Sequence, residues 1–221
     1  MMHAMILSAG RGRRMGALTD HTPKPLLLVK GQPLITYHLK ALAEAKVKNI
    51  VINLGYLGEK IEALLGDGHA FGVRIHYSYE DPILETAGGI KKALPLLGEK
   101  PFIVMSADIF TDFPFHTLNR EPKGMAHLVL TDNPPFHPKG DYALAEGRVS
   151  ESGETLLNFA GIGLYRPELF DACPKGAYPL GKLLKDSIRN GQITGEYYSG
   201  LWHNVGTSEQ LQEVEQLFLN V

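Results

Sequence analysis

The stretch AMILSAGRGRRMG, residues 4–16, decides the expected fold. Residues 4–9 are apolar or small, which is typical of a strand buried at the centre of a parallel sheet. Glycines follow directly, and glycine lets the backbone turn sharply and bring its N–H groups against phosphate oxygens. The stretch therefore predicts a central strand that ends in an anion-binding loop, although a glycine pair alone also fits a dinucleotide loop or an ordinary turn.

Strand and helix patterns alternate on either side of this loop. Helical spacing of apolar residues predicts helices over 33–45, 57–65 and 87–97, the last capped by Thr86. Strand patterns cover residues 49–54, 73–80 and 101–108. Such alternation predicts an α/β fold, with a Rossmann-like, mostly parallel mixed sheet flanked by helices.

The pattern changes after about residue 125. Short strand and hairpin patterns then dominate, and helices return at 179–190 and 207–219. No linker is long enough to separate two independent domains. We expect one domain over residues 1–221, with a nucleotide-binding half at 1–125 and a smaller β-rich, acceptor-binding lobe with C-terminal helices at 126–221.

Composition excludes several classes of function. The net charge of −2 and the pI near 6.5 argue against a polymeric nucleic acid as partner. The single cysteine, Cys173, excludes an intramolecular disulfide framework. No apolar stretch approaches the length of a membrane span, and the N-terminus lacks the features of a signal peptide. We expect a cytoplasmic protein with no membrane partner.

Three arginines distinguish the glycine loop. Arg11, Arg13 and Arg14 lie among its glycines, so guanidinium groups and backbone donors together suit a polyanion such as a triphosphate. Met15 stands where a dinucleotide loop has its third glycine, and no Gly-Lys-Ser/Thr follows for a Walker loop. The loop therefore favours a different class of nucleotide-binding protein.

Two further charged residues are candidates for the same site. Lys24 lies between Pro23 and Pro25, which hold it in an extended segment. Asp108 ends a buried strand, at the sheet edge where open α/β sheets bind ligands. A Mg²⁺ ion that bridges a triphosphate needs a hard oxygen ligand, which Asp108 could supply.

These segments together resemble the sugar-1-phosphate nucleotidyltransferases, the family that makes NDP-sugars. The resemblance is carried by AGRGRRM (9–15), ALT (17–19), TPKPLL (22–27), LETAGGI (84–90), SAD (106–108) and NVGT (204–207). It covers nearly the whole chain. It implies the nucleotide-diphospho-sugar transferase fold, and transfer of a nucleotidyl group from an NTP to a sugar 1-phosphate, with Mg²⁺ as cofactor.

The resemblance also implies roles for particular residues. Expected catalytic residues are Arg14, Lys24 and Asp108. Expected nucleotide-binding residues are Ala9, Gly10, Arg11, Gly12, Arg13, Glu85, Gly88 and Gly89. Expected sugar-binding residues are Asp141 and Gly161. Expected magnesium ligands are Asp108 and Asn204. Relatives typically have aspartate where this chain has Asn204, and an amide oxygen can coordinate Mg²⁺ but lacks the charge.

Substrate choice stays open between two members of the family. The sequence is most similar to compact bacterial enzymes that uridylylate N-acetylmuramate 1-phosphate in cell-wall recycling, and the alternative is a guanylyltransferase acting on mannose or heptose 1-phosphate. No E-K-P segment that could hold the sugar phosphate occurs in the second half. Asn204 keeps a third interpretation open, a nucleotide-binding module with weak or no turnover. We expect a monomer or a weak homo-oligomer.

Overall fold

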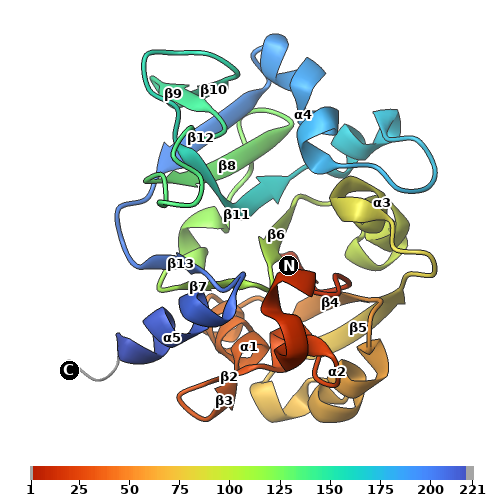
Figure 1. The fold of residues 1–221 in the computed structure, drawn as a ribbon. Helices are drawn as coiled ribbons and strands as arrows, with labels where there is room; N and C mark the ends of the chain where they lie inside the picture. The colour runs from red at the N-terminus through yellow and green to blue at the C-terminus, as the bar shows by residue number, and fades with distance from the viewer. Residues whose placement is uncertain (1, 218–221) are drawn as a thin grey trace.

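A nine-stranded sheet runs through both halves of the chain in the computed structural model, which describes residues 2–217 (Figure 1). Its spatial order is β5-β4-β1-β6-β11-β8-β12-β10-β9. In chain order these strands are β1 (His3–Leu7), β4 (Asn49–Leu54), β5 (Arg74–Tyr79), β6 (Phe102–Ser106), β8 (Ala126–Thr131), β9 (Ala143–Ala145), β10 (Arg148–Ser150), β11 (Asn158–Tyr165) and β12 (Ile193–Tyr197). Two small ribbons pair β2 (Leu28–Val29) with β3 (Gln32–Pro33), and β7 (Ile109–Thr111) with β13 (Trp202–Asn204).

Five α-helices and five short 3-10 helices connect the strands within residues 2–217. The α-helices are α1 (Leu34–Glu44), α2 (Gly58–Leu65), α3 (Glu85–Leu97), α4 (Leu180–Arg189) and α5 (Ser208–Gln216). The 3-10 helices are η1 (Arg13–Thr19), η2 (Lys24–Leu26), η3 (His69–Phe71), η4 (Phe115–Leu118) and η5 (Pro167–Ala172). Within this range, no helix combines the length and the apolar character needed to cross a membrane.

The direction of the strands places the end of β1 beside the end of β6. Strands β5, β4, β1 and β6 are parallel neighbours, and Leu7 is in register with Ser106. Strand β11 is antiparallel to both β6 and β8, whereas β12 runs parallel to β8. The second half therefore continues the same sheet, and the expected α/β architecture with a Rossmann-like first half is confirmed.

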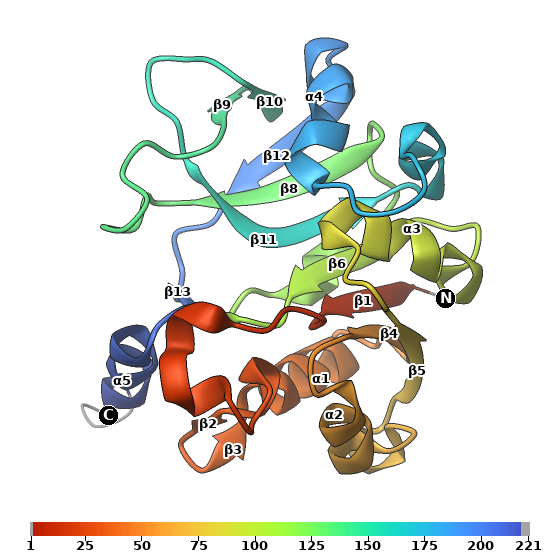
Figure 2. The same ribbon diagram turned by 45° about the vertical axis from the view of Figure 1, so that its right-hand side comes forward.

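Apolar residues cover both faces of the sheet. Residues of α1 and α2 pack on one face, where Ile35, Leu39 and Ile61 are fully buried. Residues of α3 and α4 pack on the other, where Ile90 and Leu184 belong to the core (Figure 2). The buried positions of α1 recur at the helical spacing that the sequence predicts, so the sheet fixes which face of that helix turns inward.

Most predicted helix bounds are correct to one residue, but two caps differ. Pro33 precedes α1 as its N-cap residue rather than lying in the first turn. Thr86 does not cap α3, which begins at Glu85 and has no side-chain cap. The carbonyl of Tyr178 accepts from the N–H groups of Ala87 and Gly88 instead, at 2.9 and 3.2 Å. The predicted end of the last helix, residues 218 and 219, lies outside the described residues.

The β7–β13 ribbon returns the end of the chain to the first half. Asn204 is in register with Ile109, the residue after Asp108, and the N–H of Val205 donates to the carbonyl of Asp108 at 2.7 Å. Thr207 then caps α5, since its hydroxyl accepts from the N–H of Gln210 at 3.3 Å. Two segments almost one hundred residues apart in sequence therefore meet at Asp108.

Candidate functional site

The side chains of Thr19 and Lys24 lie against the glycine loop that follows β1. Gly12 has φ +67°, a conformation that favours glycine, and a Cβ there would lie 3.2 Å from the side chain of Lys24. The hydroxyl of Thr19 donates to the carbonyls of Gly12 and Gly16, both at 3.2 Å. Gly10, by contrast, has open space where a Cβ would lie. The loop is therefore shaped by packing at Gly12, while Gly10 leaves room for a ligand to approach the backbone.

Lys24 and Asp108 form an ion pair at the end of β6. The ammonium Nζ of Lys24 lies 2.7 Å from Oδ2 of Asp108. The Lys24 side chain is 9% exposed and that of Asp108 is 34% exposed, so the lysine is fixed while the carboxylate still faces solvent. Charge-assisted hydrogen bonds of this length orient both groups. The other oxygen of Asp108 stays available to a ligand.

His38 of α1 contacts the backbone of the residue that precedes Asp108. Its Nε2 lies 3.2 Å from the carbonyl of Ala107, which only accepts, so Nε2 carries a hydrogen. Burial lowers the pKa of His38 to about 4, although the Ala107 carbonyl and the Asp108 charge act in the opposite direction. A neutral imidazole therefore anchors the residue before Asp108 without adding a charge to the site.

A first cavity, of about 410 Å³, is lined by most of the residues expected to bind phosphate. The predicted residues on its wall are Gly10, Gly12, Arg13, Arg14, Lys24 and Asp108. The remaining wall is made of Leu7, Ser8, Pro25, Thr86, Ser106, Ala107 and Gly206. Three cationic side chains face one carboxylate, so this cavity suits a polyanion.

A second cavity of about 440 Å³ adjoins the first. The two share Leu7, Thr86, Ser106 and Asp108. Asp108, Asn204, Asp141 and Gly161 are the predicted residues on its wall. Aromatic and polar side chains complete it, among them Tyr142, Phe159, Tyr165 and Trp202. None of its described lining residues is an arginine or a lysine, so its wall differs sharply from that of the first cavity.

Asp141 and Tyr142 shape the polar end of this second cavity. Oδ2 of Asp141 accepts from the N–H of Phe159 at 2.8 Å, and Oδ1 lies 3.0 Å from Nε2 of His137. Burial, and then the Asp141 charge, raise the pKa of Tyr142 to about 12, so its phenol keeps its proton at neutral pH. The cavity wall therefore offers a fixed carboxylate and a hydroxyl to a neutral polar ligand.

The amide oxygen of Asn204 is available for a metal or a ligand. Its Oδ1 is buried and has no hydrogen-bond partner within the described residues, which is uncommon for a buried acceptor. Asn204 and Asp108 line the same cavity, and Mg²⁺ commonly takes one or two protein oxygens and completes its shell with phosphates and water. Within residues 2–217 no three His, Cys, Asp or Glu side chains are placed to hold a metal. The donor set therefore fits an ion whose shell a bound triphosphate would complete.

Gly206 brings Arg14 next to Asn204. A Cβ on Gly206 would lie 3.0 Å from Oδ1 of Asn204 and 3.3 Å from Nη2 of Arg14. The absence of a side chain at Gly206 thus allows the guanidinium and the amide to approach the same point. Arg14 belongs to the glycine loop and Asn204 to β13. The pairing of β13 with β7 therefore brings Asn204 close to a site residue from the first half of the chain.

Five predicted nucleotide-binding residues lie outside the walls of the two cavities. These residues are Ala9, Arg11, Glu85, Gly88 and Gly89. The Arg11 guanidinium lies 5.0 Å from the centre of the Tyr56 ring, and Arg11 lines a separate depression with Arg13. Gly88 is buried, and a Cβ there would lie 2.2 Å from the carbonyl of Gly176. In this conformation Gly88 serves packing, and its nucleotide contact remains a prediction.

Several residues of the site carry no sequence motif of their own. Asn53 accepts from the N–H of Ser8 at 2.7 Å and donates to Oε1 of Glu80 at 2.8 Å. Oε2 of the buried Glu80 accepts from the N–H of Leu84 at 2.8 Å, and a Cβ on Gly89 would lie 2.3 Å from Oε1. This network couples the start of the glycine loop to the start of α3. Asn53, Glu80 and Gly89 lie on three separate segments, so no contiguous sequence pattern predicts this network.

Comparison with known proteins agrees with this geometry. The nucleotidyl transferase family profile matches residues 3–220. An N-acetylmuramate alpha-1-phosphate uridylyltransferase from Neisseria meningitidis serogroup B is 47% identical, over 98% of each chain. A protein with the same name from Caulobacter vibrioides is 34% identical, over 92% of this chain and 91% of its own.

More distant relatives share the fold. A mannose-1-phosphate guanyltransferase from Gibberella zeae is 28% identical over 99% of this chain and 65% of its own. The crystal structure of HddC from Yersinia pseudotuberculosis complexed with GMP-PN superimposes with a TM-score of 0.82 at 17% identity, over 99% of this chain and all of the other. The glycine loop, the Lys24–Asp108 pair and the full-length match lead to one assignment. The chain belongs to the nucleotidyl transferase family and is a nucleotidyltransferase.

Proposed function

We propose that the protein joins a nucleoside triphosphate to a sugar 1-phosphate, releasing pyrophosphate and leaving an NDP-sugar. The observation that carries this proposal is the meeting of a cationic and a cation-free cavity at Asp108. The first cavity suits the triphosphate, and the second suits the sugar. Residues 1–125 supply most of the first, and residues 126–221 supply most of the polar and aromatic wall of the second. This distribution supports the proposed division into a nucleotide-binding half and a sugar-binding lobe.

The proposed chemistry needs no general base. An oxygen of the sugar phosphate attacks the α-phosphorus, a P–O bond forms there, and the bond from the α-phosphorus to the bridging oxygen breaks. The electron pair leaves with pyrophosphate. Because the attacking oxygen is already anionic, the protein only has to position two anions that repel each other and stabilise the developing charge.

Lys24 and Arg14 are suited to that task. Lys24 is fixed at the boundary of the two cavities by Asp108, 2.7 Å away, so its charge is oriented before the substrates bind. Arg14 is exposed and lies beside Gly206, where its guanidinium can bind two phosphate oxygens at once. Gly10 is exposed and has open space beside it, so the same ligand can approach its backbone.

Asp108 and Asn204 are the residues that would hold Mg²⁺. When bound, the ion neutralises phosphate oxygens and aligns them. The single protein carboxylate makes this a weaker site than a pair of carboxylates would be. Asn204 nevertheless offers an oxygen with no competing donor among the described residues.

The proposed substrates are UTP and N-acetylmuramate 1-phosphate, which would place the reaction in cell-wall recycling in the cytoplasm. The relative with 47% identity over nearly the full length supports this choice. A guanylyltransferase acting on mannose or heptose 1-phosphate is the alternative, and the guanyltransferase relatives at lower identity support it. The protein is proposed to act as a monomer or a weak homo-oligomer.

One experiment tests the reaction and its substrates together. Purified protein is supplied with Mg²⁺, each of the four nucleoside triphosphates and a panel of sugar 1-phosphates, and pyrophosphate release is measured. We expect the largest kcat/KM with UTP and N-acetylmuramate 1-phosphate, at least about tenfold above GTP with mannose 1-phosphate, since a site that pairs polar groups discriminates by such factors. Mass spectrometry of the product identifies the NDP-sugar.

The remaining outcomes separate the alternatives. A preference for GTP with mannose or heptose 1-phosphate would replace the uridylyl assignment. Nucleotide binding without pyrophosphate release for any pair would support a binding module instead of an enzyme. Calorimetric titration with each NTP, done on the same preparation, distinguishes that case from an inactive protein.

A further inference from the structure

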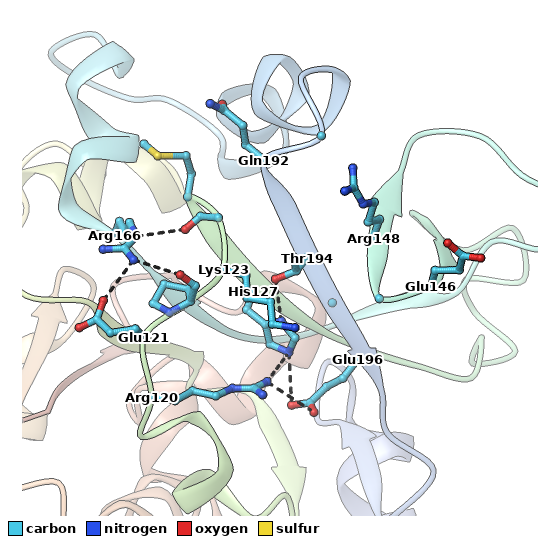
Figure 3. Close-up of a pocket in the computed structure, with 16 residues that line it drawn as sticks. Arg120, Glu121, Lys123, His127, Glu146, Arg148, Arg166, Gln192, Thr194 and Glu196 are labelled. Atoms are coloured by element: carbon cyan, nitrogen blue, oxygen red, sulfur yellow. Dashed lines mark hydrogen bonds and ion pairs between the residues drawn. The ribbon is translucent and has the colours of Figure 1, made fainter.

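A third cavity lies at the opposite end of the strands from Asp108. Its volume is about 790 Å³, larger than either cavity of the catalytic site, and it shares no lining residue with them. The starts of β8 and β12, the β9–β10 turn and the end of β11 surround it (Figure 3). We call it the distal cavity. Nothing in the proposed reaction uses it.

The distal cavity lies on the face of this part of the sheet that α4 does not cover. His127 is in register with Thr194, and Thr194 with Arg148, so these side chains form a row across β8, β12 and β10. Their neighbours Leu128, Ile193 and Val149 belong to the core on the other face, with α4. Alternation along each strand therefore turns the polar row away from α4.

A hydrogen-bond network fixes the base of the distal cavity. Nη2 of Arg120 lies 3.0 Å from Nε2 of His127, and a guanidinium only donates, so Nε2 accepts. The hydrogen of the neutral ring is then on Nδ1, 2.8 Å from Oγ1 of Thr194. His127 is buried, at 8% exposure. Figure 3 shows Arg120, His127 and Glu196 converging at this point.

The network leaves one acceptor without a donor. Oε1 of Glu196 is buried and makes no hydrogen bond within the described residues. Its nearest ionic neighbour is Nε2 of His127, at 3.6 Å, and that nitrogen carries no hydrogen in the neutral ring. Buried carboxylate oxygens are normally satisfied. The Glu196 side chain as a whole is 34% exposed, so a small rotation of its carboxylate would present this oxygen to a ligand hydroxyl, which would supply the missing donor.

Two cations of the distal cavity have no ionic partner among the described residues. Arg120 and Arg166 are paired with Glu196 and Glu121, at 3.9 and 3.1 Å. Lys123 and Arg148 are exposed, and neither side chain has a hydrogen bond or ion pair within residues 2–217; Figure 3 draws no such interaction at the Arg148 guanidinium. Four cationic and three anionic side chains line the cavity, so its excess charge is positive although the chain as a whole is at −2.

We propose that the distal cavity binds a hydroxyl-bearing phosphomonoester, with Lys123 and Arg148 at its phosphate and Glu196 accepting from a hydroxyl. The phosphate accounts for the two free cations, which form strong hydrogen bonds with phosphate oxygens. The hydroxyl accounts for the unsatisfied carboxylate oxygen. A neutral sugar would leave the cations unpaired, and inorganic phosphate would leave Glu196 unsatisfied.

Amide NMR of the full chain can locate the binding. Gly147, Gly191 and Gly195 line the distal cavity, whereas Gly10, Gly12 and Gly206 line the first cavity, so two sets of glycine signals report the two sites separately. The probes are ribose 5-phosphate, inorganic phosphate and ribose. We expect saturable shifts of the distal glycines with ribose 5-phosphate, severalfold weaker binding of phosphate and none of ribose.

Three variants and one control decide the assignment. Lys123→Ala and Arg148→Ala should each weaken ribose 5-phosphate at the distal glycines at least fivefold, and Glu196→Ala should remove its advantage over phosphate. Arg189→Ala is the control, since this exposed arginine pairs with Glu151 outside the cavity. Shifts confined to Gly10, Gly12 and Gly206, or equal affinity in Lys123→Ala, Arg148→Ala and Arg189→Ala, would overturn the proposal. The exposed Lys123 keeps the test valid even if another variant unfolds.

Discussion

The two cavities that meet at Asp108 differ in charge although both are proposed to receive anions. Arg13, Arg14 and Lys24 line the first, while no described arginine or lysine lines the second. The phosphate of the sugar must therefore be neutralised at the boundary, by groups that also contact the triphosphate. Under the proposed reaction, positive charge is concentrated where bonds form and break, and the second cavity would contact the neutral part of its ligand.

Removal of Lys24 is expected to have the largest effect. Lys24→Ala should lower kcat by about 10³-fold, the loss seen when one preorganised donor is removed from a transition state. Steady-state pyrophosphate release measures it. Stability should fall by only about 1–2 kcal/mol, because Asp108, left without its partner, is 34% exposed and can be rehydrated.

A second lysine variant serves as the control for this effect. Lys40 is exposed on α1 and donates to Gln32, away from both cavities. Lys40→Ala should keep wild-type turnover and a wild-type urea midpoint. If Lys24→Ala also kept its turnover, the charge of Lys24 would not contribute to catalysis. The difference in charge between the two cavities would then not explain the reaction.

Two arginines of one loop provide a sharper comparison. Arg14 lines the first cavity, whereas Arg11 stacks over Tyr56 outside it. Arg14→Ala should lower kcat by about 10²-fold, and Arg11→Ala by no more than a few-fold, since only the first removes a phosphate contact made in the cleft. Equal losses would show that the loop moves when nucleotide binds and brings Arg11 into the site.

The sequence places best those residues whose position follows from a local rule, while their roles stay predictions. The glycine loop, Lys24 and Asp108 each follow a strand or lie between prolines, so local rules place them on the same sheet edge. Asp141 and Gly161 also line the expected cavity, although their part in sugar binding remains a prediction. Such positions depend on strand order, which alternation of strands and helices largely fixes.

Contacts between distant segments could not be predicted. Strand β12, ITGEY, has one large aliphatic residue, so its pattern gives no strand signal, yet it lies between β8 and β10. His38 looks like any residue of an amphipathic helix until α1 packs beneath Ala107. Thr86 has the residue type of a helix cap, but the carbonyl of Tyr178 takes that role and Thr86 faces both cavities. Tertiary contacts decide each case.

His38 connects the site to the pH dependence of stability. The pKa is about 4 in the folded protein and 6.5 in an unfolded chain, so between these values the unfolded state binds a proton that the folded state does not. Stability should therefore be complete above pH 6.5 and fall by at most about 3 kcal/mol as the pH drops toward 4. Urea unfolding at several pH values measures the slope. His38→Gln should flatten it, whereas His116→Gln, at an exposed position, should not.

The smallest effect is expected at Asn204, an uncharged residue that lines the second cavity and lies close to Gly206 of the first. If its free Oδ1 is a metal ligand, Asn204→Asp adds a carboxylate beside Mg²⁺. Attraction between unit charges 4 Å apart is on the order of 4 kcal/mol at an effective dielectric of 20, and desolvation and screening reduce the net gain to about 1 kcal/mol. That corresponds to a several-fold lower half-saturating Mg²⁺ concentration, measured from initial rates at fixed NTP.

Asn119→Asp, which makes the same change of charge at an exposed position away from the cavities, should leave the titration unchanged. Superimposable curves for wild type and Asn204→Asp would show that Asp108 and the phosphate oxygens hold the ion alone, and that the amide of Asn204 is free to contact the sugar phosphate instead.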